Sequence, residues 1–156
     1  MKILIIGAEG FIGSHLVENL VSKGHDVTAF VLYNSFNFYG WLEHIDKKKF
    51  KKIKIITGDV RDFQSVSLAL KNKDAVINLA ALIAIPYSYQ AARSYIETNI
   101  IGTHNILEAA KAINHPQLID LVVNFGKKPE AQSSKTEEPL IKEKQDEVKT
   151  EKVVKT

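Results

Sequence analysis

The chain has 156 residues, 45% of them hydrophobic, and a formal net charge of +3 at pH 7. This length suits one domain with a hydrophobic core rather than two, and the small charge gives no reason to expect nucleic-acid binding. No apolar run reaches the roughly 18 residues that a membrane-spanning helix needs, and the N-terminus lacks the pattern of a secretory signal. The chain contains no cysteine, which excludes disulfides, thiolate zinc sites and a cysteine nucleophile. We therefore expect a cytoplasmic protein without a membrane partner.

Short apolar segments alternate with helical ones over residues 1–126. Strands are expected near 2–6, 26–32, 53–57, 75–78 and 118–124. Helices are expected near 11–23 and 64–70 and from 91–95 through 99–113, with a further candidate at 41–48. Because short strands joined by helices require right-handed crossovers, the pattern predicts a doubly wound parallel α/β sheet with strand order 3-2-1-4-5.

The composition changes after residue 126. Half of residues 127–156 are charged, eight of them lysines and seven acidic, and none is aromatic. Because the few apolar residues there cannot form a core, we expect a disordered Lys/Glu-rich tail, with a short helix over 141–154 as the alternative.

Three glycines, Gly7, Gly10 and Gly13, directly follow the first predicted strand and open the first predicted helix. In such a turn the first glycine permits a tight bend, the second lets the backbone approach a pyrophosphate, and the third lets helix and strand pack closely. Free N–H groups at the helix start then face the anion. The sequence therefore predicts a Rossmann-type dinucleotide site, and the alternative is a strand–helix turn without a ligand.

A Rossmann domain that uses NAD usually carries an acidic residue at the end of its second strand, where it accepts from the ribose 2′-hydroxyl. Here that strand ends at Leu32 and continues with Tyr33, Asn34 and Ser35, so no acid is present. Asn34 and Ser35 can bond either a hydroxyl or a 2′-phosphate, which leaves the choice between NAD and NADP open. The alternative is that these residues form only a polar loop.

Asp59 and Val60 follow the third predicted strand, at the carboxyl edge of the sheet. A carboxylate there can accept from an adenine amino group while the next backbone N–H faces the ring. Nearby, Asp62 is expected to cap the following helix.

The fourth strand ends in the short run Leu79, Ala80 and Ala81. Small residues at this switch point of the sheet would let a cofactor lie across the strand ends, and simple strand-to-loop packing is the alternative. Farther on, Asn99 lies among apolar residues of a predicted helix and must satisfy its amide. It does so by bonding a nearby backbone group, by lining the site, or by both.

Two other patterns indicate no ligand. The six lysines between residues 47 and 54 are interrupted only by Phe50 and Ile53, so they favour a solvated helix end over a nucleic-acid surface. The five histidines are scattered without metal-ligand spacing, and we expect no metal site.

With these residues identified, the stretch from Met1 to about residue 113 resembles the extended short-chain dehydrogenase/reductase family. Within it, the chain is similar to the branch of NAD(P)-dependent nucleotide-sugar epimerases and 4,6-dehydratases. The resemblance rests on GAEGFIGSHLVENLVSKGHDV, TGDVRD, DAVINLAALIAIPYSY and TNIIGTHNILEAA, in this order and at ordinary separations. It implies that the backbone at Phe11 and Ile12 holds the pyrophosphate, Asp59 and Val60 the adenine, and Leu79, Ala80 and Ala81 the nicotinamide ribose side, with Asn99 near the site.

The chemistry of the family transfers a hydride from a sugar carbon to NAD(P), using a tyrosine base in a Tyr-x-x-x-Lys pair and a Ser or Thr after the fifth strand. This sequence contains no such pair. Its fifth predicted strand is directly followed by no Ser or Thr either, since the residues at its end are Asn124-Phe125-Gly126. We therefore predict no catalytic residue here. We expect a truncated cofactor-binding half, which acts on a nucleotide sugar only if another chain completes it. The alternatives are a non-catalytic dinucleotide-binding or redox-sensing module and one subunit of a split enzyme, and the exposed sheet edge favours a homo- or hetero-oligomer.

Overall fold

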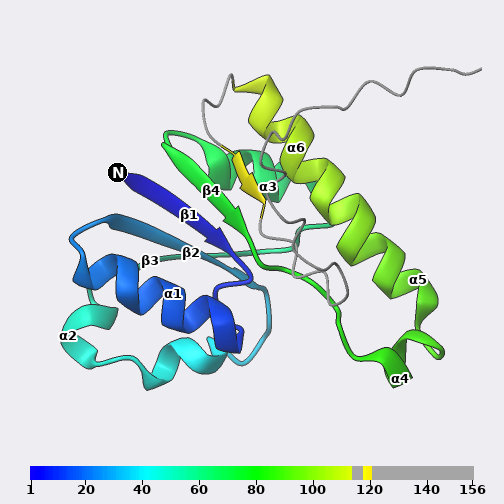
Figure 1. Ribbon diagram of the computed structural model, residues 1–156, viewed down its shortest axis with the longest axis horizontal. Helices are drawn as coiled ribbons and strands as arrows, with labels where there is room; N and C mark the ends of the chain where they lie inside the picture. The colour runs from blue at the N-terminus through cyan, green and yellow to red at the C-terminus, as the bar shows by residue number, and fades with distance from the viewer. Residues whose placement is uncertain (114–117, 121–156) are drawn as a thin grey trace, which may run out of the picture. The chain divides into compact units, whose positions relative to one another are not determined.

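Five parallel strands form one sheet, in the order β3-β2-β1-β4-β5 (Figure 1). The computed structural model describes residues 1–113 and 118–120. The strands are β1 (Lys2–Ile6), β2 (Asp26–Leu32), β3 (Lys54–Gly58), β4 (Ala75–Asn78) and β5 (Leu118–Asp120). The predicted doubly wound α/β fold and its strand order are confirmed. Residues 121–124 of the expected fifth strand and the expected tail at 127–156 lie outside the described residues.

The helices follow the predicted alternation, with two differences. They are α1 (Phe11–Ser22), the 3-10 helix η1 (Gly40–His44), α2 (Lys47–Phe50), α3 (Phe63–Leu70), α4 (Ile85–Ser88), α5 (Ala92–Tyr95), the π-helix η2 (Ile96–Ile101) and α6 (Gly102–Ala112). The single helix expected at 41–48 is divided, because the Asp46 carboxylate accepts from the backbone N–H groups of Lys48 and Lys49 and starts α2 anew. The short α4, which has Pro86 in its first turn, was not predicted.

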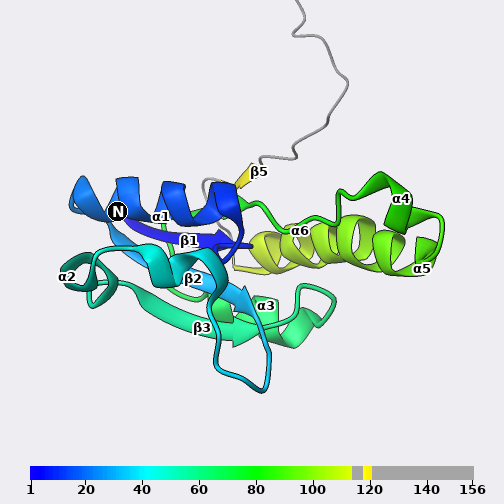
Figure 2. The same cartoon turned by 90° about the horizontal axis from the view of Figure 1, so that it is seen from below.

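Each face of the sheet carries its own apolar core. Side chains alternate along β1, so Ile3 and Ile5 pack with α1 and η1 on one face, while Leu4 and Ile6 pack with α3 and α6 on the other. Figure 1 shows α1 and α3 on opposite sides of the strands. On the second side, α5, η2 and α6 run on as one continuous helical rod (Figure 2).

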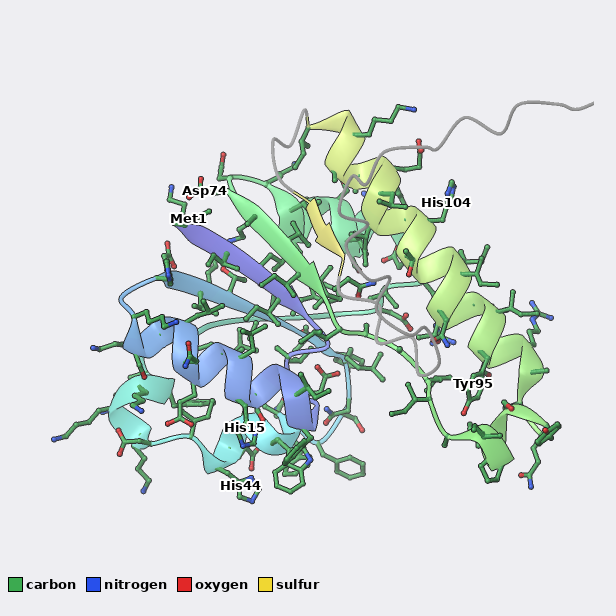
Figure 3. All side chains as sticks on the ribbon, in the orientation of Figure 1. Met1, His15, His44, Asp74, Tyr95 and His104 are labelled. Atoms are coloured by element: carbon green, nitrogen blue, oxygen red, sulfur yellow. The ribbon has the colours of Figure 1, made fainter. Side chains whose placement is uncertain are left out.

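The two ends of the strands differ in what they carry. At the amino edge, the backbone N–H of Lys2 donates to the Asp74 carboxylate at 2.6 Å, and the N–H of Asp74 donates to the carbonyl of Lys2 at 2.8 Å. Asp74 and Met1 lie together at this edge (Figure 3). The loops that leave β1, β3 and β4 all lie at the opposite, carboxyl edge, where open α/β sheets bind their ligands.

Candidate functional site

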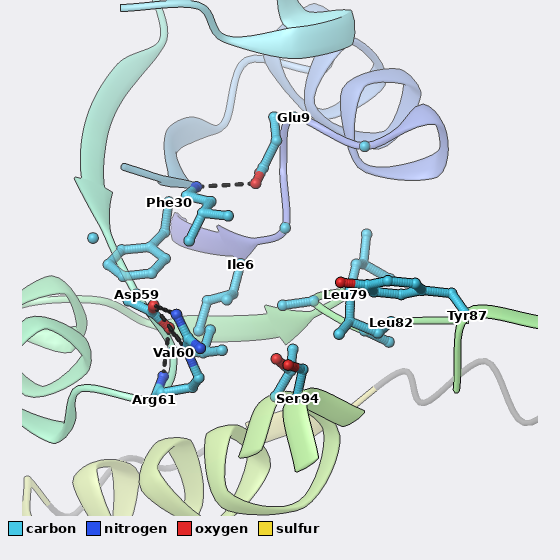
Figure 4. Close-up of a pocket in the computed structure, with 17 residues that line it drawn as sticks. Ile6, Glu9, Phe30, Asp59, Val60, Arg61, Leu79, Leu82, Tyr87 and Ser94 are labelled. Atoms are coloured by element: carbon cyan, nitrogen blue, oxygen red, sulfur yellow. Dashed lines mark hydrogen bonds and ion pairs between the residues drawn. The ribbon is translucent and has the colours of Figure 1, made fainter. Parts of the chain in front are cut away.

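A cavity of about 400 Å³ lies at the carboxyl edge of the sheet, over the ends of β1, β3 and β4 (Figure 4). It brings together half of the residues predicted to bind a cofactor: Gly7, Gly10, Asp59, Val60, Leu79, Ala80 and Ala81. The other predicted residues do not line it: Phe11, Ile12, Gly13, Tyr33, Asn34, Ser35 and Asn99. Sequence reasoning missed several lining side chains, among them Glu9, Arg61, Tyr87, Ser94 and Thr98.

The bend after β1 requires glycine at position 7. Gly7 has a φ of +76°, in the left-handed region, and a Cβ there would lie 2.7 Å from the backbone nitrogen of Ala80. The backbone N–H groups of Gly7 and Ala8 both donate to the carbonyl of Phe30 in β2, at 3.1 and 3.4 Å. This glycine therefore lets the loop after β1 touch the loop after β4 and closes one wall of the cavity.

Gly13 and Gly10 serve different purposes. A Cβ on Gly13 would lie 2.3 Å from the carbonyl oxygen of Gly7, so the close packing of α1 on β1 depends on it. A Cβ on Gly10 would meet only that same carbonyl, at 3.4 Å, and Gly10 has an ordinary extended conformation. The fold does not require glycine at position 10. The absence of a side chain there leaves space for a ligand to approach the backbone.

The N-terminus of α1 offers unpaired backbone donors. Gly10 is its N-cap and supplies no side-chain acceptor. Since the first N–H groups of a helix have no acceptor within the helix, those at Phe11 and Ile12 are free to bind an anion. Their side chains are more than half exposed and do not line the cavity.

The loop after β3 is held by an ion pair. The Asp59 carboxylate accepts from the backbone N–H of Arg61 at 2.9 Å and from its guanidinium Nε at 2.9 Å (Figure 4). The hydrogen bond from the Arg61 side chain lowers the pKa of Asp59 below its ordinary value of 3.8, against the opposing effect of burial. The carboxylate that was expected to meet adenine is thus already paired, and its contact with a base stays a prediction.

Asp62 caps α3 as the sequence predicted. Its carboxylate accepts from the backbone N–H groups of Gln64 and Ser65, at 3.0 and 3.3 Å, and from the Ser65 hydroxyl at 2.6 Å. The hydrogen bond from the Ser65 side chain is the main cause of a lowered pKa at Asp62. Asp62 therefore fixes where the loop after β3 ends.

Two residues of α6, missed by the sequence reasoning, position the same loop. The buried amide of Asn105 donates to the carbonyls of Val60 and Arg61, both at 3.0 Å. Gly102 allows this contact because a Cβ there would lie 2.8 Å from the Val60 side chain. The signal in the sequence was a polar amide on the apolar face of a helix, six residues beyond the asparagine that was singled out.

The loop after β4 is fixed by two asparagines. The amide of Asn99 is bonded at both ends to Leu82, donating to its carbonyl at 2.9 Å and accepting from its N–H at 2.8 Å. The Asn78 side chain accepts from the N–H of Ala80 at 3.1 Å. Of the two roles left open for Asn99, the structure shows the bond to backbone, and its contact with a cofactor stays a prediction.

In the loop after β2, the Asn34 side chain forms hydrogen bonds with the backbone of the same loop. The Asn34 side chain accepts from the N–H groups of Phe36 and Phe38, both at 3.1 Å, and donates to the carbonyl of Phe38 at 2.7 Å. Tyr33 and Ser35 lie outside the cavity wall. The amide expected to read the ribose is therefore occupied within its own loop, and a ligand must displace these bonds to use it.

Metal and membrane sites receive no support from residues 1–113 and 118–120. Figure 3 shows His15 and His44 on the side of α1 and η1, and His104 on α6. No group of three or more metal-ligating side chains gathers in the part of the chain that is described. None of the helices in that part is long and apolar enough to cross a bilayer.

Comparisons with known proteins agree with this geometry. The family model described as GDP-mannose 4,6 dehydratase matches residues 4–124. Among curated proteins, Protein CapI of Staphylococcus aureus is 37% identical over 123 residues, which cover 76% of this chain and 36% of CapI. UDP-glucose 4-epimerase of Lactobacillus helveticus is 34% identical over 122 residues, which cover 76% of this chain and 34% of the epimerase. The chain thus spans about a third of the length of these relatives.

Solved structures give the same result. UDP-glucose 4-epimerase from Bifidobacterium longum, in complex with NAD+ and UDP, superposes with a TM-score of 0.66 at 30% identity, covering 77% of this chain and 36% of that one. Pen from Bacillus thuringiensis superposes with a TM-score of 0.68 at 28% identity, covering 76% of this chain and 37% of Pen. The resemblance drawn from the sequence motifs is confirmed.

The Asp59–Arg61 pair predicts a pH-dependent stability. Because the pKa of Asp59 is lower in the folded chain than its ordinary 3.8, the pair stabilises the fold above that pH and ceases to do so as the pH falls through the folded value. At neutral pH, Asp59→Asn should lower the free energy of unfolding by about 1 kcal/mol, the upper end for partly exposed pairs. Urea denaturation of both proteins, repeated at decreasing pH, should show this difference shrinking below 3.8. Arg61→Gln should remove the same pH dependence, and a difference that does not vary with pH would contradict the assignment.

Proposed function

The chain belongs to the GDP-mannose 4,6 dehydratase family, and on that premise we propose that it forms the NAD(P)-binding region of a nucleotide-sugar epimerase or dehydratase. The observation that carries the proposal is Gly10. It is the one glycine of the three whose added Cβ the fold would accommodate, and it lines the cavity beside the free N–H groups of α1. The fold does not need glycine at this position, which is the N-cap of α1. The missing side chain therefore leaves room for a pyrophosphate to approach the backbone at the start of the helix.

The rest of the cavity fits the other parts of a dinucleotide. Asp59 and Val60, beyond β3, lie where the adenine end would rest, and Leu79, Ala80 and Ala81, beyond β4, lie where the nicotinamide ribose would rest. The backbone of Phe11 and Ile12 would hold the phosphates, and Asn99 would act through the loop that it braces. Volumes of this order are usual for cofactor sites.

The bound cofactor would supply a hydride acceptor, and the chain's own residues would bind and orient it. Leu79, Ala80, Ala81 and Leu82 line the cavity beyond β4, and these apolar side chains would form the wall against which the nicotinamide end rests. The sugar chemistry also needs a base, and the sequence contains no Tyr-x-x-x-Lys pair. We therefore propose binding as the function of this chain by itself, and nucleotide-sugar turnover only together with a polypeptide segment that supplies the base.

Two alternative functions are consistent with cofactor binding by this chain and a base supplied from elsewhere. Binding without turnover is the property of a non-catalytic dinucleotide module, and completion by another chain is the property of a split enzyme. The absence of cysteine fits a reducing compartment, so we place either function in the cytoplasm.

An apolar helical face supports association with a second polypeptide. Ile96, Ile100 and Leu107 lie along η2 and α6 and are 53%, 60% and 44% exposed. Exposed apolar side chains that share one helix face mark interaction surfaces.

We expect sedimentation velocity to show the chain as a dimer and the double variant Ile96→Ser, Ile100→Ser as a monomer. A monomeric parent chain at micromolar concentration would contradict pairing through this face.

Calorimetric titration tests the cofactor proposal directly. The chain should bind NAD+ or NADP+ at one site, and Gly10→Val should abolish measurable binding because the valine fills the path of the pyrophosphate. The variant should keep its fold, since only the carbonyl of Gly7 lies near the new Cβ.

The matched control is Gly24→Asn at the far end of α1. Gly24 has a φ of +81° and no atom within 4 Å of an added Cβ, and asparagine tolerates this conformation. This variant should bind as the parent chain does. Failure of the folded parent chain to bind either dinucleotide would refute the proposed function.

A further inference from the structure

Glu9 places a carboxylate where the second strand lacks one. It lies in the glycine loop between Gly7 and Gly10 and lines the cavity. Its Oε1 accepts from the backbone N–H of Leu32, the last residue of β2, at 2.9 Å (Figure 4). An acidic group thus occupies the carboxyl end of β2, although it comes from 23 residues earlier in the chain.

The backbone of Glu9 is held in place from the other side. Its carbonyl accepts from the N–H of Trp41 at 2.9 Å. Gly40, with a φ of +59°, makes this approach feasible, because a Cβ there would lie 2.6 Å from the same carbonyl oxygen. Backbone contacts at Trp41 and Leu32 therefore fix both ends of the residue, which is how a side chain is kept ready for a ligand.

One oxygen of this carboxylate has no partner. Among the described residues, Glu9 Oε2 is the buried side-chain atom without a hydrogen bond. A buried acceptor that remains unpaired is costly, so such atoms usually bond a ligand or water. A hydroxyl group can donate to this carboxylate, whereas a phosphate has no proton to give it at neutral pH and adds like charge.

Among the residues that the structure describes, no free cation in the cavity wall offsets that charge. Arg61 is the basic side chain that lines the cavity, and its guanidinium is bonded to Asp59 and lies 3.8 Å from the Glu97 carboxylate. Two acidic groups already neutralise it, so it is not free to receive a 2′-phosphate. Asn34, the other candidate, uses its amide within its own loop.

We propose that Glu9 accepts from the ribose 2′-hydroxyl of NAD and makes the chain discriminate against NADP. The glycine loop thereby supplies the acid that a Rossmann domain usually carries at the end of its second strand. This inference rests on the proposed function, since it assumes that the cavity binds a dinucleotide.

Titration of the parent chain with NAD+ and with NADP+ gives the first test. We expect NAD+ to bind at least about tenfold more tightly, since one hydrogen bond to a charged group commonly changes affinity by that factor or more. Equal affinity for the two cofactors would overturn the inference and leave the proposed function intact. Absence of binding by both would overturn the proposed function and the inference with it.

Glu9→Gln gives the second test. The amide oxygen of glutamine still accepts from Leu32, so the loop should keep its geometry, while the negative charge is removed and a donor is gained. The ratio of NAD+ to NADP+ affinity should fall by about tenfold, mainly because NADP+ binds more tightly.

Glu43→Gln is the matched control for this measurement. Glu43 also accepts from a backbone N–H, that of Tyr39 at 3.0 Å, but it does not line this cavity. Its substitution should leave the ratio unchanged. An unchanged ratio in Glu9→Gln, or an equal change in both variants, would overturn the assignment to Glu9.

Discussion

The site depends on one close approach, between Gly13 in the first turn of α1 and the carbonyl of Gly7 at the end of β1. A Cβ on Gly13 would lie 2.3 Å from that oxygen and 2.8 Å from the Cα of Ala8. Any larger residue would force the helix away from the strand. Because the first turn of α1 packs this closely against the end of β1, the free N–H groups and the positive end of the helix dipole lie over the carboxyl edge of the sheet. The proposed anion site is thus a consequence of how tightly helix and strand pack.

Three asparagines hold the other walls of the cavity. Asn105 bonds the loop after β3, Asn99 the loop after β4, and Asn78 the first turn of that same loop. In each case a side-chain amide satisfies backbone groups that lie in no strand or helix, which would otherwise be left without partners. Loops fixed in this way need little reordering when a ligand arrives, and that reduces the cost of binding.

The sequence predicted the features that depend on residues close together in the chain. Strand positions and order followed from apolar runs, and Gly7, Gly10, Gly13 and Asp62 from spacing next to a strand or helix. It could not predict contacts made across the fold. The bond from the Leu32 N–H to the Glu9 carboxylate and those from Asn105 to the β3 loop join residues 23 and about 45 positions apart, and no periodicity marks either pair.

The remaining differences have similar causes. Asn34 was expected to face a ribose, yet its short side chain finds acceptors and donors two and four residues away, as asparagine in loops often does. The divided helix between β2 and β3 follows from a capping aspartate inside a segment whose composition reads as helical throughout. Local competition of this kind decides details that propensity alone leaves undetermined.

We propose that a dinucleotide lies across the carboxyl edge of this sheet, on the glycine loop. The backbone amide NMR signals of the 15N-labelled chain, followed while NAD+ is added, would report this placement residue by residue. We predict that the shifted signals fall in three groups: residues 7–13 of the glycine loop, 59–61 after β3 and 79–82 after β4. Shifts that gather instead around Tyr39, Phe50 and Lys51, which line a separate cavity, or no shifts at saturating NAD+, would contradict this placement of the dinucleotide.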